Sequence, residues 1–477
     1  MSASAEADPT LLAFNGVHAR TGEYLFPPVP MADLGIALRE GTSGDLSAAA
    51  ALKRVTAGAR AHKLGLAHHE DPLRLETTGW AVVCHSSEIE TLREALRPLL
   101  DLRALQTGAE SRVLQYNGED CRRWLESNEV EPGCPRADTV PYYLLLAGDP
   151  EKIPFEFEHK LAPHHAVGRL AFDSAAEYRR YAETMVRYET GRLQPRARRV
   201  ALFGPKHDRQ TKLAADHLGH IAQRGLKCSE VPSSTANVEL SVHLGDNATK
   251  AELAHLLSGQ DARCAVLVTA THGLGADPDD PEQRDIQGAL LCDWPGSAIR
   301  PEHYLAAADV HETWDVAGLI TVHLACFSGG TPTHDRFGRL GPDAPKILAK
   351  RPFVAALANA LLGHPAGGAI SCIAHVDRAW NFSFSPNKPL SPNSVFERLL
   401  TNLICGEPVG HAVRDLRSRF TFAEGELAEH LHHMRLGASI SLDELTYSWL
   451  NRNDAQAYAV LGDPAVRLRH TQTAELP

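Results

Sequence analysis

Two short motifs in this chain carry side chains that could do chemistry together. The stretch ATHGLG (residues 270–275) ends an apolar run with His272 and Gly273, and HLACFSGG (residues 323–330) ends another with Cys326. A cysteine thiol is mostly protonated at neutral pH. A neighbouring imidazole favours the nucleophilic thiolate and can then protonate a leaving amine. If the two apolar runs are adjacent strands, the pair forms a catalytic dyad.

Both motifs follow strands of a predicted parallel sheet. Near-continuous apolar runs predict strands at 263–271 and 317–325. In such sheets functional residues gather where the strands end at their carboxyl termini, which is where His272 and Cys326 stand. We expect the backbone N–H groups of Gly273 and Cys326 to face the oxyanion formed when a carbonyl is attacked. Glycine at 273 would also let a substrate approach the backbone closely.

Each motif taken alone has a simpler interpretation. A cysteine at a strand end is most often inert packing, and a His-Gly pair is most often a turn. Other cysteine–histidine pairs are less suitable, because Cys372 and His375 lie on one predicted strand and point to opposite faces. The histidines at 164–165 and 430–433 lack a third ligand, so we expect no metal and no cofactor.

Strands and helices alternate along the chain from residue 78. Apolar runs such as PYYLLLAGD (141–149) and VALFG (200–204) are separated by amphipathic helices. This alternation predicts an α/β fold of mostly parallel sheets covered by helices. An Arg- and Pro-rich stretch at 193–199 is the predicted linker between two such units. The expected divisions are an N-terminal extension of unknown role (1–77), a first unit (78–192) and a second unit (198–470).

Capping boxes mark where two of the helices begin. Ser87 with Glu90, and Ser174 with Glu177, have the S-x-x-E spacing in which side chain and backbone cap each other. Pro98 lies inside the first predicted helix and should kink it, because proline lacks the N–H that the helix needs.

Composition bounds the class of protein. The 477 residues allow two or three domains, and 43% hydrophobic with 22% charged residues is typical of a globular protein. The 48 basic and 59 acidic side chains leave a net charge of −11, which disfavours nucleic acid as a partner. No apolar stretch approaches the ~20 residues that span a bilayer. With an acidic N-terminus unlike a signal peptide, the sequence predicts a cytoplasmic protein that does not bind membranes.

Taken in order, the motifs resemble the caspase-like clan of cysteine peptidases, with its CHAT-domain and gingipain-type branches. The histidine precedes the cysteine by 54 positions (272 to 326), near the spacing of caspases. Two flanking segments, LLLAGDPEKIPF (144–155) and VLGDPAVRL (460–468), match the gingipain type in the same order. The nine cysteines are otherwise scattered and contain no C-x-x-C pair, so they suggest neither a disulfide framework nor a zinc ribbon.

The resemblance implies two caspase-like subdomains, the first inactive and the second catalytic. It also implies a cysteine endopeptidase with Cys326 as nucleophile and His272 as general acid/base, acting on protein substrates. Relatives that cleave after Arg or Lys carry an acidic residue beyond the first strand of the catalytic unit, which makes Asp208 the candidate for substrate binding. A helix cap is the alternative for Asp208. Trp380 is a candidate wall of the substrate cleft, or else a core tryptophan.

Two loops near the motifs suggest specificity and regulation. DPDDPEQRD (277–285) is acidic and could attract basic substrates or calcium, or simply be solvated. The loop at 331–351 is rich in Pro and Gly, and we hypothesise activating cleavage there, near Arg336, Arg339 or Lys350, by the protein itself or by an upstream protease in a bacterial proteolytic or defence pathway. The alternative is an ordinary surface loop. The alternative to the whole enzyme hypothesis is a catalytically silent caspase-like module that binds a partner protein.

Overall fold

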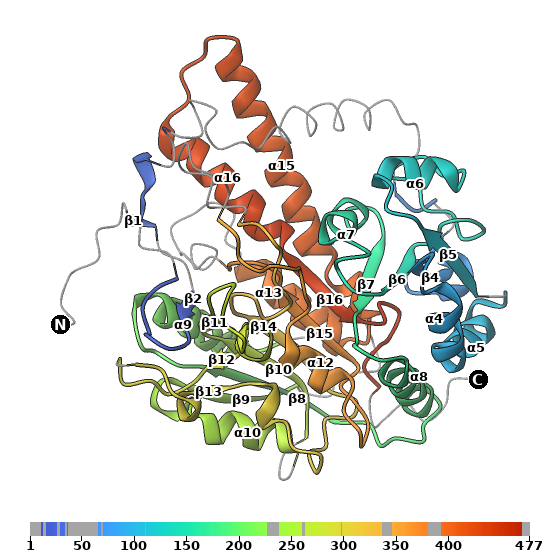
Figure 1. Ribbon diagram of the computed structural model, residues 1–477, viewed down its shortest axis with the longest axis horizontal. Coiled ribbons are helices and arrows are strands. Elements are labelled where there is room, and N and C mark those ends of the chain that lie inside the picture. The colour runs from blue at the N-terminus through green and yellow to red at the C-terminus, as the bar shows by residue number, and fades with distance from the viewer. Residues whose placement is uncertain are drawn as a thin grey trace.

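One ten-stranded sheet forms the centre of the molecule (Figure 1). The computed structural model describes residues 11–12, 16–25, 29–33, 36, 65–67, 70–109, 111–226, 238–259, 263–296, 298–335, 346–379 and 393–469. The strand order is β5-β4-β6-β7-β16-β15-β14-β10-β8-β9. The strands are β4 (Trp80–His85), β5 (Arg112–Tyr116), β6 (Tyr143–Ala147), β7 (Ala166–Leu170), β8 (Ala197–Gly204), β9 (Glu239–Leu244), β10 (Cys264–Ala270), β14 (Ile320–Leu324), β15 (Ser371–His375) and β16 (Tyr458–Gly462).

The sheet is mostly parallel, as the alternation of strands and helices predicts. The pairing of β15 with β16 is antiparallel, whereas β16 is parallel to β7, so the five strands from β5 to β16 run opposite to the five from β15 to β9. Every residue of β6, β10 and β14 is buried, which explains why these strands read as continuous apolar runs. β9 was not predicted: it lies at the edge of the sheet, and its residues are exposed or half-buried, so its sequence lacks that signal.

Helices flank the sheet (Figure 1). Two of them, α15 and α16, pack together and project from the body of the molecule at the top of the view. The longer helices are α4 (Ile89–Ala95), α5 (Arg97–Thr107), α6 (Cys121–Ser127), α7 (Phe155–Leu161), α8 (Ala175–Glu189), α9 (Arg209–Arg224), α10 (Lys250–Ser258), α12 (Ala356–Leu362), α13 (Asn393–Ile404), α15 (Arg414–Arg435) and α16 (Leu442–Gln456).

The helix starts test the capping predictions. The break at Pro98 is confirmed, because α4 and α5 are separate helices and proline stands in the first turn of α5. The capping box of Ser174 and Glu177 is also confirmed, at the start of α8. The predicted box at Ser87 is wrong, because the Ser87 hydroxyl lies 2.8 Å from Nδ1 of His85 and does not cap α4.

The two predicted units share the one sheet. β16 lies between β7 and β15, with Leu461 opposite Arg169. The stretch predicted as a linker is partly structured, since residues 197–199 are the start of β8. Arg196 just before it is buried and donates a hydrogen bond to the carbonyl oxygen of Ala317 at 2.7 Å.

A buried ion pair joins the first unit to the last strand. Arg103 on α5 and Asp463 after β16 are 1% and 0% exposed, and Arg103 Nε donates to Asp463 Oδ2 at 2.8 Å. Trp80 Nε1 donates to the other carboxylate oxygen at 2.9 Å, and Glu189 accepts from the remaining guanidinium nitrogens. The aspartate of the second GDP segment therefore has a structural role.

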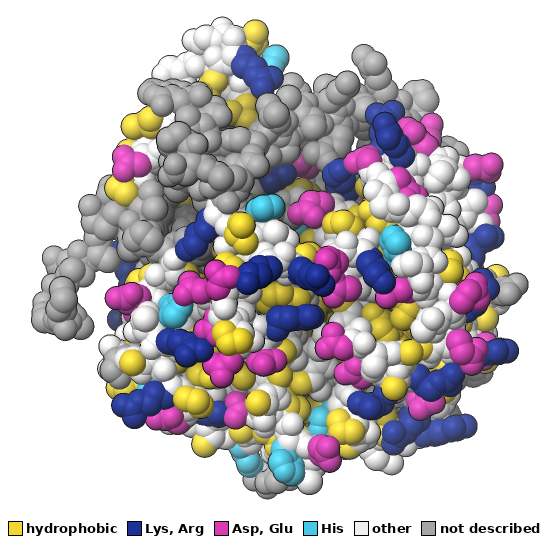
Figure 2. Space-filling view, viewed as in Figure 1, with side chains coloured by type: hydrophobic (Ala, Val, Ile, Leu, Met, Phe, Trp, Pro, Cys, Tyr) yellow, Lys and Arg dark blue, Asp and Glu magenta, His cyan; other side chains and the backbone are white. Residues whose placement is uncertain are grey.

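A small second sheet stands beside the carboxyl end of β10. Its order is β13-β12-β11-β2, so a strand from the N-terminal extension forms one edge. The face seen in Figure 2 carries Lys and Arg interspersed with Asp and Glu. Among the described residues, no helix is long and apolar enough to cross a bilayer. Cys405 is disulfide-bonded. The strands of the small sheet are β2 (Gly16–His18), β11 (Gly273–Gly275), β12 (Leu290–Leu291) and β13 (Tyr304–Leu305).

The Asp463 network gives a stability prediction. Replacing Asp463 with Ala leaves Arg103 charged and buried without that partner, so we expect the free energy of unfolding to fall by about 3–5 kcal/mol. Chemical denaturation measures the loss. Asp138→Ala removes an exposed ion pair with Arg136 and serves as the control, with an expected change within about 0.5 kcal/mol. A loss at Asp463 no larger than the control's would contradict the structural role.

Candidate active site

Three neighbouring parallel strands deliver the candidate residues to one edge of the sheet. β10 pairs with β8 on one side and with β14 on the other. The last paired positions of β10 and β14 are Ala270 and Leu324. His272 and Cys326 each stand two residues beyond that pair, so the expected juxtaposition of the two motifs at one sheet edge is met.

The backbones of the two motifs touch. A Cβ built on Gly273 would overlap the carbonyl oxygen of Cys326, so only glycine allows this approach. The predicted reason for glycine, access for a substrate, is therefore not the one seen, because the chain's own nucleophile loop fills that space. An oxyanion role for the N–H groups of Gly273 and Cys326 stays a prediction.

Asp208 lies against the candidate histidine. It follows β8, and its Oδ2 is 2.6 Å from Nε2 of His272. Its Oδ1 accepts hydrogen bonds from the backbone N–H and the hydroxyl of Thr211, both at 2.9 Å, which makes Asp208 the N-cap of α9. The alternative interpretation as a helix cap is thus confirmed, and contact with His272 is an added role. Binding of a substrate side chain by Asp208 stays a prediction.

The charge on Asp208 is strongly favoured. Burial by itself would raise the pKa of this carboxyl group. The charge and hydrogen bond of His272, the Thr211 amide and the Tyr24 hydroxyl oppose burial, and together they hold the pKa of Asp208 well below its ordinary value. The site therefore contains a carboxylate that fixes the orientation of the histidine ring.

The turn at Cys326 has an unusual backbone. Phe327 has φ of 58° and Asp377, which faces it, has φ of 80°, both in the left-handed region that bulky and branched residues avoid. The Phe327 N–H donates to the Asp377 carbonyl oxygen at 2.7 Å, which ties the two turns together. This arrangement brings the N–H of Ala379 to 3.2 Å from Cys326 Sγ. The Cys326 thiol also donates to the carbonyl oxygen of Ala379 at 3.7 Å, so the backbone of Ala379 holds the sulfur in place through both of its polar groups.

Both candidate residues are completely buried in this conformation. His272 and Cys326 are each 0% exposed. The N-terminal extension supplies part of the cover: the Tyr24 hydroxyl donates to Asp208 Oδ2 at 2.7 Å, and its ring meets the His272 ring edge-on at 5.9 Å between centroids. Leu25 packs beside Cys326.

Sequence reasoning did not find this contribution of residues 16–25. A weak signal is present, because Thr21-Gly22 between the apolar Val17 and Tyr24 is a plausible hairpin turn. The signal could not show which part of the fold this segment would touch.

The remaining predicted residues divide into two groups. Trp380, Arg336 and Arg339 lie outside the described residues. Lys350 is exposed and forms an ion pair of 2.7 Å with Asp279 in the acidic loop. Within the part of the chain that the structure describes, no group of three or more His, Cys, Asp or Glu residues could hold a metal ion.

Comparisons with known proteins give only distant similarities. No family model and no curated protein matches the chain. A solved structure titled "Structure of Protease" is 13% identical, with a TM-score of 0.49, over 86% of this chain and 84% of that one. The separase–securin complex of Saccharomyces cerevisiae is 12% identical, with a TM-score of 0.32, over 68% of this chain and 16% of that one.

The Asp208–His272 contact predicts a pH dependence. A carboxyl group whose pKa is lowered on folding stabilises the fold above its unfolded pKa of about 3.9, and this contribution disappears as the pH falls further. Asp208→Asn keeps an N-cap residue but cannot ionise. We therefore expect wild type to be more stable than the variant near neutral pH, with the difference shrinking below about pH 4.

Urea denaturation at a series of pH values measures this difference. Asp101→Asn, which removes an exposed carboxylate on α5, controls for the loss of one negative charge. A wild-type advantage that does not change with pH would count against the ion pair.

Proposed function

We propose that this protein is a caspase-like cysteine endopeptidase with Cys326 as nucleophile, His272 as general acid/base and Asp208 as the residue that positions the histidine. The observation that carries the proposal is the line of three residues at the ends of three adjacent parallel strands. Asp208 contacts His272 at 2.6 Å, and Gly273 touches the backbone of Cys326. A carboxylate, an imidazole and a thiol in this order have the components of a nucleophilic triad.

Peptide hydrolysis by these groups proceeds in two halves. The imidazole of His272 takes the thiol proton, and Sγ of Cys326 attacks the peptide carbonyl carbon to give a tetrahedral oxyanion. The imidazolium then protonates the leaving amine as the C–N bond breaks, which leaves an acyl-enzyme. A water molecule, deprotonated by the same imidazole, hydrolyses the thioester and restores the thiol.

The hydrogen bonds of the site support this assignment of roles. Nε2 of His272 is the atom near Asp208, so Nδ1 is the nitrogen that we assign to proton exchange with Cys326. The carboxylate stabilises the positive charge that the ring acquires during the reaction. The N–H groups of Gly273 and Cys326 are the proposed donors to the oxyanion.

Cleavage after Arg or Lys is the finer part of the proposal. Asp208 is already bonded to His272, Tyr24 and Thr211, which favours a positioning role over direct binding of a substrate cation. The acidic loop, with Asp280 and neighbouring carboxylates, is the other source of attraction for basic peptides. We retain Trp380 as a proposed wall of the cleft, protein substrates as the partners, and the cytoplasm as the location.

Substitutions at the three positions test the proposal with fluorogenic peptides that carry Arg, Lys or Asp before the cleaved bond. Cys326→Ala should abolish hydrolysis of every peptide that wild type cleaves, and His272→Ala should reduce it by about 100-fold or more, since proton transfer is lost. Asp208→Asn should lower the rate for all substrates by the same factor if it acts through His272. A loss confined to Arg and Lys peptides would instead assign Asp208 to substrate binding.

Cys134→Ala is the matched control, because Cys134 is a partly exposed thiol outside the site. Unchanged hydrolysis in Cys326→Ala would eliminate the peptidase proposal. Absence of hydrolysis in wild type, with no His272-dependent alkylation of Cys326 by iodoacetamide, would favour the silent module that binds a partner.

Activation by cleavage at 331–351 is a separate expectation of the proposal. Replacing the candidates Arg336, Arg339 and Lys350 with Ala, together with the loop's other basic residues Lys346 and Arg351, should leave the chain uncut and of low activity, because the basic side chains that a trypsin-like cleavage requires are then absent. Electrophoresis and mass spectrometry of the purified protein before and after incubation detect the cut. Full activity of an intact chain would reject this mode of activation.

A further inference from the structure

The buried active site raises a problem of access that the structure itself helps to resolve. Cys326 and His272 have no exposed surface, yet a peptide carbonyl must come within about 3–3.5 Å of the sulfur to react. Some part of the cover must therefore move if the proposed function holds. Residues 16–25, here called the N-terminal hairpin, form one part of this cover.

The N-terminal hairpin lies directly on the reacting groups. A Cβ built on Gly16 would be 3.5 Å from Cys326 Sγ, so the backbone of β2 runs beside the sulfur. Leu25 packs in the same cluster as Cys326, and its side chain fills the space that a Cβ at Gly275 would need. Tyr24 covers His272, with the two rings packed edge-on.

Strand pairing holds the hairpin in this position. β2 pairs in parallel with β11, placing Gly16 opposite Gly273 and His18 opposite Gly275. β11 is the strand that follows the catalytic histidine, and its other edge is already taken by β12. The edge that β2 covers is thus the one edge of β11 that an extended peptide could join by backbone hydrogen bonds.

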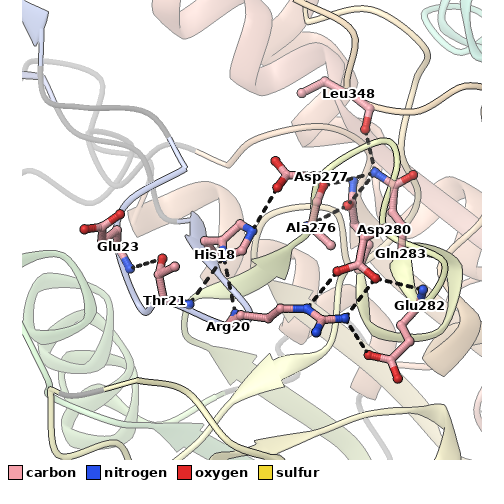
Figure 3. Close-up of polar contacts among 11 residues, drawn as sticks. His18, Arg20, Thr21, Glu23, Ala276, Asp277, Asp280, Glu282, Gln283 and Leu348 are labelled. Carbon is pink, nitrogen blue, oxygen red and sulfur yellow. Dashed lines mark hydrogen bonds and ion pairs between the residues drawn. The ribbon is translucent and has the colours of Figure 1, made fainter.

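Ion pairs join the N-terminal hairpin to the acidic loop at 277–285 (Figure 3). Arg20 Nε is 2.9 Å from Asp280 Oδ2, and a second guanidinium nitrogen is 3.0 Å from Glu282 Oε2. His18 Nε2 lies 3.6 Å from Asp277 Oδ2. The side chains of Arg20 and Glu282 are 58% and 63% exposed, whereas that of Asp280 is 9% exposed. Salt therefore screens the guanidinium side of these ion pairs, and their loss costs less than the loss of a pair buried on both sides.

We propose that a substrate peptide pairs with the edge of β11 that β2 covers. In the present conformation the N-terminal hairpin occupies this edge as an internal cover, and the ion pairs of Arg20 hold it in place. This inference rests on the proposed function for the identity of the incoming peptide. The Arg20 contacts lie at the outer side of the hairpin while Cys326 and His272 are buried, so loss of Arg20 loosens the cover from outside. Opening of the cover also removes the Tyr24 hydroxyl from Asp208.

Alkylation of Cys326 by iodoacetamide tests the cover without any peptidase assay. In the full-length protein, Arg20→Ala should increase the alkylation rate about two- to fivefold, as for the loss of exposed ion pairs, and Leu25→Ala should increase it more. The wild-type rate should rise with salt while the Arg20→Ala rate changes little. Arg93→Ala, which removes an exposed pair with Glu90 on α4, should match wild type.

A peptide with the sequence of residues 16–25 tests whether the edge of β11 binds an extended chain. Added to the Leu25→Ala protein, it should slow alkylation again, whereas a scrambled peptide should not. Alkylation rates in Arg20→Ala and Leu25→Ala that equal wild type would overturn the proposal, as would a peptide without effect.

Hydrolysis measured in parallel separates this inference from the proposed function. Faster alkylation with no hydrolysis by any variant would support the cover and reject the peptidase. Hydrolysis by wild type with unchanged alkylation in both variants would support the peptidase and reject the cover. A fall in hydrolysis in Arg20→Ala would also reject the cover, because it would make the hairpin a permanent support of the site.

Discussion

The pairing of β10 with β14 is the constraint on which the candidate site depends. Side chains alternate between the two faces of a sheet, so a slip of one residue in this register would point one of the two motifs away from the other. The observed register puts Ala270 beside Leu324, which leaves His272 and Cys326 at the same level. The glycine after the histidine then allows the two turns to touch.

Asp208 connects the site to the helix layer. One carboxylate oxygen caps α9 and the other meets His272, so the orientation of the histidine is tied to a rigid element rather than to a mobile loop. Buried carboxylates are costly unless they are fully hydrogen-bonded. Here donors from three different parts of the chain meet that requirement, including Tyr24 from the N-terminal extension.

Two arginines show how burial decides what a charge can do. Arg103 is almost completely buried with Asp463, so breaking that pair would leave an uncompensated charge and unsettle the sheet. Arg20 makes comparable contacts with its own side chain 58% exposed and that of Asp280 9% exposed, so water and salt can reach the guanidinium group. The Arg103–Asp463 pair is suited to joining the two predicted units permanently. The ion pairs of Arg20 are suited to holding a segment that can be displaced.

The α/β class, the mostly parallel sheet and most strand positions could be predicted from the sequence, because strands buried on both faces must be apolar throughout. The sequence also singled out Cys326 and His272, since each follows such a strand, while the resemblance to peptidases that cleave after Arg or Lys pointed to Asp208 as a substrate-binding residue. The packing of the complete fold was needed to show that the two predicted units share one sheet and that Asp208 contacts His272. It alone showed that residues 16–25 lie on the site. Local patterns record what a segment needs to be buried, but contacts between residues more than 180 positions apart, such as Tyr24 with Asp208, depend on how the whole chain packs.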